Sequence, residues 1–400
     1  MNRHSDSKQH RVLPGWPRYD DDEISAVAKV LASGRVNYWT GDEGRKFERE
    51  FADYVGVDHG VALANGSVAL ELALRALDIK TGDEVIVTPR SFIASASSIV
   101  VCGATPVFAD IDRNSQNITA ETIAPRISSR TRAIMLVHLA GWPCDMAPIL
   151  KLAKQHDLRI IEDCAQAHGA TYDRCPVGSF GDIGVFSFCQ DKIITTGGEG
   201  GMLVTRSKAL WEKAWSYKDH GKSHAAVYDP GPSQTGAFRW VHESFGSNFR
   251  MTEMQAAIGR IQLRKLDGWI EQRTTNARVL IERLSDIPAL RVPVPDGRIR
   301  HAYYKLYTFL NPELLRPGWD RDRVISAVNE LGTPCFGGSC SEVYREGAFM
   351  NSPFRQDTRL PLARELGDTS LMFPVHPTLT TADMNHMAGI IGQVMRQAQA

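Results

Sequence analysis

Short apolar runs alternate with stretches of helical period from about residue 22 to residue 260. Each run is rich in Val, Ile, Leu or Phe and is bounded by Gly, Asp or Asn, which is typical of buried strands. The predicted strands cover residues 61–64, 84–88, 106–109, 133–139, 158–163, 184–188 and 201–205. The predicted helices between them include residues 20–32, 68–77, 92–101 and 146–156. This alternation predicts an α/β fold with a mostly parallel sheet that is covered by helices on both faces.

The pattern changes near residue 252. A long helical period over residues 252–284 leads out of the sheet region, and a strand at 303–310, a helix at 321–331 and a final helix from Thr381 follow it.

We therefore expect three parts, namely a polar tail at residues 1–12, a large domain at residues 13–262 and a small domain at residues 263–400. Residues 225–239, which contain Asp229-Pro230-Gly231-Pro232, are predicted to form a surface loop or insertion.

Composition and charge exclude several classes of protein. The 400 residues are 43% hydrophobic and 23% charged, and 46 acids balance 46 bases, so nothing favours a nucleic acid or a membrane surface as partner. No apolar run approaches the roughly 20 residues of a membrane span, and the polar N-terminus lacks the apolar centre of a signal peptide. Seven scattered cysteines suggest a reducing cytoplasm rather than a disulfide framework.

The ends of two predicted strands carry the residues with the most specific chemistry. Lys192 follows the apolar run 184–188 and precedes a glycine-rich turn at 197–201, and Asp163 ends the run 158–163. A lysine that forms a Schiff base and an acid that holds a pyridinium nitrogen are the two groups that pyridoxal phosphate needs most. Each also has an ordinary alternative, because most lysines are solvated surface residues and Asp163 could cap the next helix.

Further residues near strand ends could complete such a site. Asn65-Gly66-Ser67 joins a strand to a helix start, where free amides and a hydroxyl could bind a phosphate. Ser187 could reach the same phosphate, Gln166 could hydrogen-bond a ring hydroxyl, and Phe92 could stack on a ring. Alternatively, Asn65 or Ser67 is an ordinary helix cap, and Ser187 and Phe92 face the core.

Motifs of competing functions are absent from the sequence. Gly178, Gly181 and Gly184 form G-x-x-G-x-x-G, which lacks the close first pair of glycines of a dinucleotide-binding turn. The chain has no G-x-x-x-x-G-K-[ST] of a nucleoside triphosphatase and no G-x-S-x-G around Ser67. No Cys-x-x-Cys occurs, so we expect no structural zinc and no other metal.

Several segments, taken together and in order, are similar to a known family. They are ANGSVAL at 64–70, GDEVIV at 82–87, GATPVF at 103–108, VHLAG at 137–141, EDCAQAHG at 162–169, FSFCQDK at 186–192 and GSNFRMTEMQAA at 246–257. With them the chain resembles the DegT/StrS-type sugar aminotransferases, a branch of the fold-type I pyridoxal phosphate enzymes. The resemblance covers nearly all of the chain after the first ten or so residues. It implies a large cofactor-binding domain with a mostly parallel seven-stranded sheet flanked by helices, followed by a smaller α+β domain.

The resemblance also implies a role for each cofactor residue. Lys192 would carry pyridoxal 5'-phosphate as an internal aldimine and move the proton, and Asp163 would pair with the pyridinium nitrogen. The other implied contacts are Gln166 to the ring oxygen, Phe92 on the ring face, Gly66, Ser67 and Ser187 to the phosphate, and Asn248 to the phosphate from the other subunit of a homodimer. Glutamate or glutamine would donate the amine, leaving pyridoxamine phosphate, and a nucleotide-linked keto sugar would accept it in amino-sugar biosynthesis.

The substrate side is the less specific part of the resemblance. Arg250 lies on the same loop as Asn248, and Trp39, His301 and Tyr304 could also line the sugar site, although structural packing explains each equally well. Residues 337–344 lack the histidine that relatives often carry in that loop. Three alternatives stay open: amination of a cyclitol or an unactivated keto sugar, a dehydration on the same scaffold, and a non-catalytic regulator. Related dehydratases carry histidine at the position of Lys192, so the lysine favours transamination.

Overall fold

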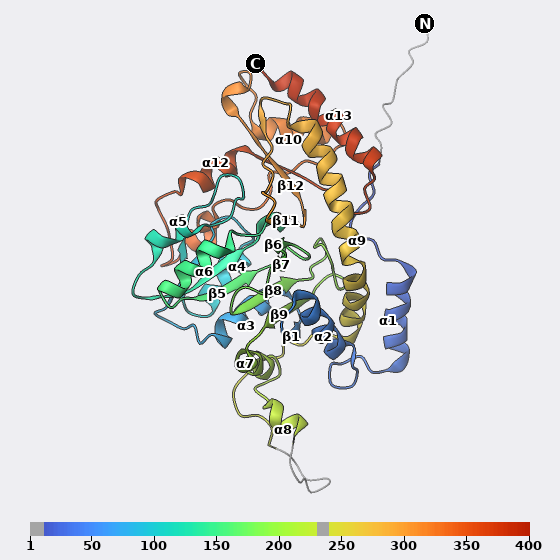
Figure 1. Cartoon of the computed structure of the whole chain (residues 1–400), viewed down its shortest axis with the longest axis vertical. Helices are drawn as coiled ribbons and strands as arrows, with labels where there is room; N and C mark the ends of the chain where they lie inside the picture. Colours follow the sequence, from blue (N-terminus) through green and yellow to red (C-terminus); the bar gives the residue numbers. More distant parts are fainter. Residues whose placement is uncertain (1–11, 230–239) are drawn as a thin grey trace.

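The computed structural model describes residues 12–229 and 240–400, and most of the predicted polar tail therefore lies outside the described residues (Figure 1). The large sheet has seven strands in the order β1-β9-β8-β5-β4-β2-β3. These are β1 (His59–Leu63), β2 (Glu84–Val87), β3 (Thr105–Phe108), β4 (Thr131–Val137), β5 (Arg159–Asp163), β8 (Ile183–Ser187) and β9 (Gly201–Thr205). Strand β9 is antiparallel to both of its neighbours, and the other pairs are parallel. The predicted mostly parallel sheet is confirmed.

Helices connect these strands and cover the sheet (Figure 1). They are α1 (Asp21–Ser33), α2 (Glu43–Val55), α3 (Gly66–Ala76), α4 (Ala94–Val101), α5 (Ala120–Ile123), α6 (Met146–Gln155), α7 (Lys208–Lys218) and α9 (Glu253–Leu284). Local signals set several of their ends. The left-handed Gly34 and Gly56 terminate α1 and α2, and a capping box between Thr252 and Gln255 starts α9.

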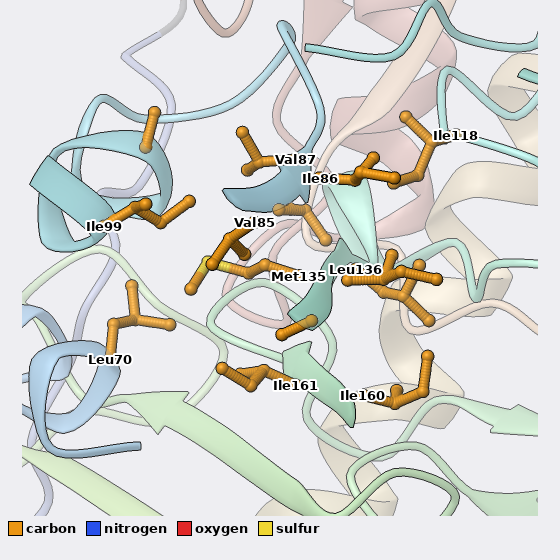
Figure 2. Close-up of a cluster of buried hydrophobic side chains, with 14 of the residues drawn as sticks. Leu70, Val85, Ile86, Val87, Ile99, Ile118, Met135, Leu136, Ile160 and Ile161 are labelled. Carbon is orange, nitrogen blue, oxygen red and sulfur yellow. The ribbon is translucent and has the colours of Figure 1, made fainter. Parts of the chain in front are cut away.

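Alternate residues of the edge strand β1 pack on opposite faces of the sheet. Val61 and Leu63 of β1 belong to a core with α3 and α4, whereas Ala62 faces a second core that contains Phe47 and Phe51 of α2. Figure 2 shows part of the first core, where side chains of β2, β4 and β5 meet Leu70 and Ile99. The two-residue period of a strand therefore builds both layers at once.

The C-terminal part adds a small antiparallel sheet in the order β10-β12-β13. Its elements are β10 (Leu290–Arg291), β12 (Leu306–Leu310), α10 (Arg321–Glu330), α11 (Gly347–Met350), α12 (Pro361–Thr369), β13 (Ser370–Phe373) and α13 (Thr381–Ala398). A further small sheet joins β11 (Ile299–Arg300) to β6 (Thr171–Tyr172) and β7 (Cys175–Pro176). The domain boundary predicted at residues 262 and 263 falls within α9 and stays a prediction.

One local prediction is wrong at its start. Residues 225–228, expected in a loop, belong to helix α8 (His224–Tyr228), and residues 230–239 of that loop lie outside the described residues. The Ser223 side chain caps α8 by accepting a hydrogen bond from the Ala226 N–H, and the His224 and Tyr228 rings contact Trp215. The Pro and Gly signals for a loop begin only at Pro230, so they did not apply to this turn.

Within the described parts of the chain, we find no helix with the length and apolar character that a membrane crossing requires.

A buried ion pair joins α2 to α7. Lys218 Nζ lies 3.1 Å from Glu48 Oε1, and the two side chains are 0% and 10% exposed. The Glu48 carboxylate also accepts hydrogen bonds from the Tyr38 hydroxyl and the Ala62 N–H. The Glu48 carboxylate therefore has hydrogen-bond donors as well as a counter-charge, which offsets the cost of burying the ion pair.

We predict that Glu48→Gln lowers the free energy of unfolding by about 3 to 5 kcal/mol, because it leaves the Lys218 ammonium buried without its counter-charge. Urea unfolding of the two proteins measures the difference. Glu212→Gln is the matched control, since Glu212 pairs with Lys208 at 3.7 Å on the surface, and it should change stability by less than about 0.5 kcal/mol. Equal effects of the two substitutions would contradict the prediction.

Candidate active site

Strand β5 ends in two acids whose side chains point to opposite sides of the sheet. Asp163 is 4% exposed, and its carboxylate accepts hydrogen bonds from the Ser95 hydroxyl at 2.8 Å and the Ala165 N–H at 3.1 Å. Burial raises the pKa of the Asp163 carboxyl, although these two donors and the positive charge of Lys192 act in the opposite direction. Asp163 is therefore a desolvated acid that a cation at this position would stabilise.

Glu162, the other acid, is fully satisfied within the protein. It accepts hydrogen bonds at 2.8 Å from the backbone N–H groups of Gly178, Phe180 and Gly181, and its carboxylate lies 3.0 Å from His138 Nε2. Gly178 and Gly181, whose spacing does not fit a dinucleotide-binding turn, thus form a turn around this carboxylate. This turn fixes the end of β5 and the start of β8, the two strands that carry the site.

Lys192 lies in the segment that follows β8, and its position there is fixed from two sides. The Lys192 N–H donates to the Cys189 carbonyl at 3.1 Å, and the Lys192 carbonyl accepts a hydrogen bond from Trp16 Nε1 at 2.8 Å. The side chain is half-buried, and its Nζ lies 5.1 Å from the centre of the Tyr304 ring. Backbone contacts therefore hold the main chain of Lys192, while its amine faces Tyr304.

Gly66 and Ser187 lie against each other at the start of α3. A Cβ atom at Gly66 would come within 2.7 Å of Ser187 Cβ, so only glycine fits this contact. Asn65 caps α3, since its side chain accepts a hydrogen bond from the Val68 N–H, which confirms the cap alternative for Asn65. Gly66 and Ser67 contribute the first amides of an 11-residue helix, and Ser67 is exposed. The predicted phosphate residues are thus brought together around a helix N-terminus.

Gln166 connects the site to the C-terminal part of the chain. Its side-chain oxygen accepts a hydrogen bond from the Ala140 N–H at 2.8 Å, which leaves its amide NH₂ group for a ring oxygen. The Ala140 carbonyl in turn accepts from the Tyr304 N–H at 2.9 Å. The Tyr304 hydroxyl donates to Asp191, the neighbour of Lys192. One chain of contacts therefore links Gln166, through Ala140 and Tyr304, to the residue next to Lys192.

Phe92 is not a core residue, because its side chain is 67% exposed, and the core alternative for it is wrong. It precedes α4, and its carbonyl accepts a hydrogen bond from the N–H of Ser95, whose hydroxyl reaches Asp163. An exposed ring one turn from Ser95 is thus held near the Asp163 carboxylate.

The His301 side chain is buried against its neighbours and is not exposed to a ligand. Its ring stacks on the Tyr303 ring with centroids 4.0 Å apart, and its Nδ1 accepts a hydrogen bond from the Tyr303 N–H. Burial lowers the pKa of His301 to about 3, so the ring is neutral at physiological pH. Of the two candidates in this segment, Tyr304 contacts Lys192 and His301 supports the fold of the segment.

Asn248, Arg250 and Trp39 form a second group. Asn248 is exposed, and the carbonyl of the next residue, Phe249, accepts a hydrogen bond from the Ala64 N–H just ahead of Gly66. Arg250 pairs with Asp219 at 2.7 Å.

Asp219 in turn pairs with Lys222, whose Nζ lies 4.1 Å from the centre of the Trp39 ring. In the part of the chain that the structure describes, no contact links Trp39 to Lys192 or Asp163.

Two residues of the site were not expected from the sequence. Ser95 donates to Asp163, and Trp16 donates to the backbone of Lys192 across 176 positions of the chain. Ser95 lies in a predicted helix, one turn after Phe92. Its short spacing from Phe92 could have indicated that its hydroxyl also lies near the end of β5. Trp16 follows the polar tail, and no local pattern distinguishes it from a packing residue.

The residues present suit pyridoxal phosphate. The raised pKa of Asp163 marks a carboxylate that lacks a cation, which is the position a pyridinium nitrogen needs. The amides of Gly66 and Ser67 begin α3 beside Ser187, and such a helix start could bind a phosphate. Lys192 Nζ faces the Tyr304 ring and its charge acts on the Asp163 carboxyl, so its amine could form a Schiff base with a cofactor held there.

Comparison with known proteins agrees with this geometry. A model of the DegT/DnrJ/EryC1/StrS aminotransferase family matches residues 17–392. GDP-perosamine synthase of Caulobacter vibrioides is 37% identical over 96% of this chain and 98% of its own length. A UDP-N-acetyl-3-dehydro-alpha-D-glucosamine 3-aminotransferase of Acidithiobacillus ferrooxidans is 35% identical over 94% of each chain. The crystal structure of an aminotransferase from Psychrobacter cryohalolentis is 52% identical and superimposes with a TM-score of 0.94 over 96% of this chain and 99% of that one. The chain belongs to the DegT/DnrJ/EryC1/StrS aminotransferase family of pyridoxal phosphate-dependent sugar aminotransferases.

Proposed function

We propose that this enzyme transfers the amino group of glutamate or glutamine to a nucleotide-linked keto sugar, in amino-sugar biosynthesis. The observation that carries the proposal is the arrangement of Lys192, Asp163 and the Gly66–Ser187 contact at one edge of the sheet. The names of the relatives support the nucleotide-linked class, since both curated enzymes are named for sugars carried on GDP or UDP.

Each residue has a physical task in this proposal. When bound, pyridoxal phosphate supplies an electron sink for the carbanion that forms at the amino carbon. Asp163 holds the positive charge of the ring nitrogen in a desolvated site, where the interaction is strong. Gln166 orients the ring oxygen, and Phe92 covers the ring face. Lys192, whose amine faces Tyr304, would remove the proton from the amino carbon of the substrate as a general base.

The phosphate is held by the start of α3. The amides of Gly66 and Ser67, with the Ser67 and Ser187 hydroxyls, offer donors at the positive end of the helix. We infer that Asn248 of the second chain of a homodimer adds a further donor to this phosphate, because Asn248 is exposed on a loop beside Ala64. All seven cysteines are free thiols, which agrees with a cytoplasmic enzyme.

The substrate class is tested with a panel of keto sugars, with and without an attached nucleotide, offered with glutamate or glutamine. Mass spectrometry should find a new amino sugar from the nucleotide-linked members. Lys192→Ala should lose the visible absorption of the covalently bound cofactor and form no detectable product, because no other amine occupies its position. Lys154→Gln, an exposed change on α6, should behave as the wild type. Product formed only from cyclitols or free sugars, or formed by Lys192→Ala, would refute the proposal.

Asp163→Asn should separate stability from activity. A carboxyl whose pKa is higher in the folded chain loses stability as the pH rises above its unfolded value of about 4. Without cofactor, the variant should therefore be at least as stable as the wild type at pH 7 in urea unfolding. Its kcat with cofactor should fall roughly 100-fold or more, because the ring nitrogen loses its ionic partner. Ser95→Ala, which keeps the carboxylate, should lose less activity, and equal losses would contradict this assignment.

Mixed dimers test whether Asn248 acts across subunits. Asn248→Ala should weaken retention of the cofactor, because a phosphate donor is lost. Lys192→Ala and Asn248→Ala chains, mixed and reassociated at equal amounts, should regain up to about a quarter of the wild-type sites, since one site of each hybrid dimer is intact if sites are shared. Equilibrium dialysis and the absorption of the bound cofactor measure the recovery. No recovery in verified hybrid dimers would place Asn248 in the site of its own chain.

A further inference from the structure

Two lysines approach the same aromatic ring beside the proposed reaction centre. Lys192 Nζ lies 5.1 Å from the centre of the Tyr304 ring, and Lys305 Nζ lies 4.9 Å from it. Lys305 is half-buried and directly precedes strand β12. Its ammonium group therefore comes from the C-terminal part of the chain to the ring that Lys192 also contacts, and the charges of the two lysines act on each other.

Lys305 has no carboxylate partner among residues 12–229 and 240–400. Burial lowers the pKa of its ammonium group, and the charges of Arg273 and Lys192 lower it further, while Asp191 raises it. Asp191 already accepts a hydrogen bond from the Tyr304 hydroxyl. A half-buried lysine without a counter-charge is costly unless an anion binds to it.

Arg273 adds a second positive charge that no acid neutralises in the described structure. Its side chain is 1% exposed, and one nitrogen, Nη1, donates weakly to the Tyr303 and Tyr304 carbonyls at 3.4 and 3.3 Å. Its Nε and Nη2 atoms have no hydrogen-bond partner among the described residues. Arg273 lies beneath the ring of Trp16, 5.2 Å from its centre, so it raises the local positive potential without being open to a ligand. Lys305 is the accessible member of this positively charged group.

The reaction itself supplies an anion at this place. An amino-acid donor carries its α-carboxylate on the same carbon as the amine that replaces Lys192, so the carboxylate must lie within a few ångströms of the Lys192 amine. The reacting carbonyl of a keto sugar is neutral, and nucleotide phosphates are attached at a different carbon of the sugar. We propose that Lys305 binds the α-carboxylate of the amino donor and thereby orients it for proton transfer. This inference rests on the function proposed above.

The experiment measures the two halves of the reaction separately in the cofactor-loaded enzyme. Lys305→Gln should raise the glutamate or glutamine concentration needed for half-maximal loss of the bound-cofactor absorption by roughly ten- to a hundredfold, the worth of a hydrogen bond to a charged group. The KM for the keto sugar in the second half should stay within about twofold, since its reacting group is neutral. Lys305→Arg should recover most of the donor affinity because it keeps the charge. Lys154→Gln is the matched control at an exposed position.

A second readout is independent of turnover. Glutarate, a dicarboxylate without an amine, should bind the wild-type holoenzyme in isothermal titration calorimetry and bind Lys305→Gln roughly tenfold or more weakly. An unchanged thermal unfolding profile and cofactor spectrum would show that Lys305→Gln folds.

An effect on the sugar KM alone, or no effect in either half, would overturn the assignment. A different outcome separates the two proposals. If no amino acid removes the bound-cofactor absorption of the wild type, the proposed function fails. If glutarate binding still depends on Lys305 in that case, the anion-binding site remains supported.

Discussion

The site depends on two adjacent acids at the end of β5 that meet opposite environments. Glu162 accepts three backbone N–H groups and contacts His138, so its burial is compensated by the fold itself. Asp163 receives only a hydroxyl and one N–H, and burial raises its pKa. The first acid fixes the strand that holds the second. The second is a desolvated carboxyl, which a bound cation such as a pyridinium nitrogen would stabilise in its charged form.

The rest of the site extends from that strand end through short-range contacts. Ser95 ties Asp163 to the start of α4, where Phe92 is exposed, and Gln166 ties the next loop to Ala140. Ala140 in turn pairs with Tyr304, whose hydroxyl reaches the segment of Lys192. Rigid strand ends therefore position residues from five segments of the chain, while the groups that would touch substrate lie on loops between them.

The balance of charge changes across the site. The start of α3, which we propose binds the phosphate, offers amides and hydroxyls at a helix N-terminus. A second part of the site gathers Lys192, Lys305 and Arg273 around Tyr304, and the negative charge of Asp191 acts on Lys305 and Arg273. Under the proposed function, a ligand with a phosphate at one end and a carboxylate at the other would therefore meet hydrogen-bond donors or positive charge at both ends.

The sequence alone determined the α/β class, the placement of the strands along the chain and the residues at their ends. These follow from local periodicity and turn chemistry, which also mark Lys192, Asp163 and Gly66 as candidate site residues. Tertiary structure decided the insertion of antiparallel β9 between β1 and β8, the exposure of Phe92, and the separate surroundings of Tyr304, His301 and Trp39. The contact of Tyr304 with Asp191 joins residues 113 positions apart. Strand order and packing create such contacts, and neither is encoded in the period of any one segment.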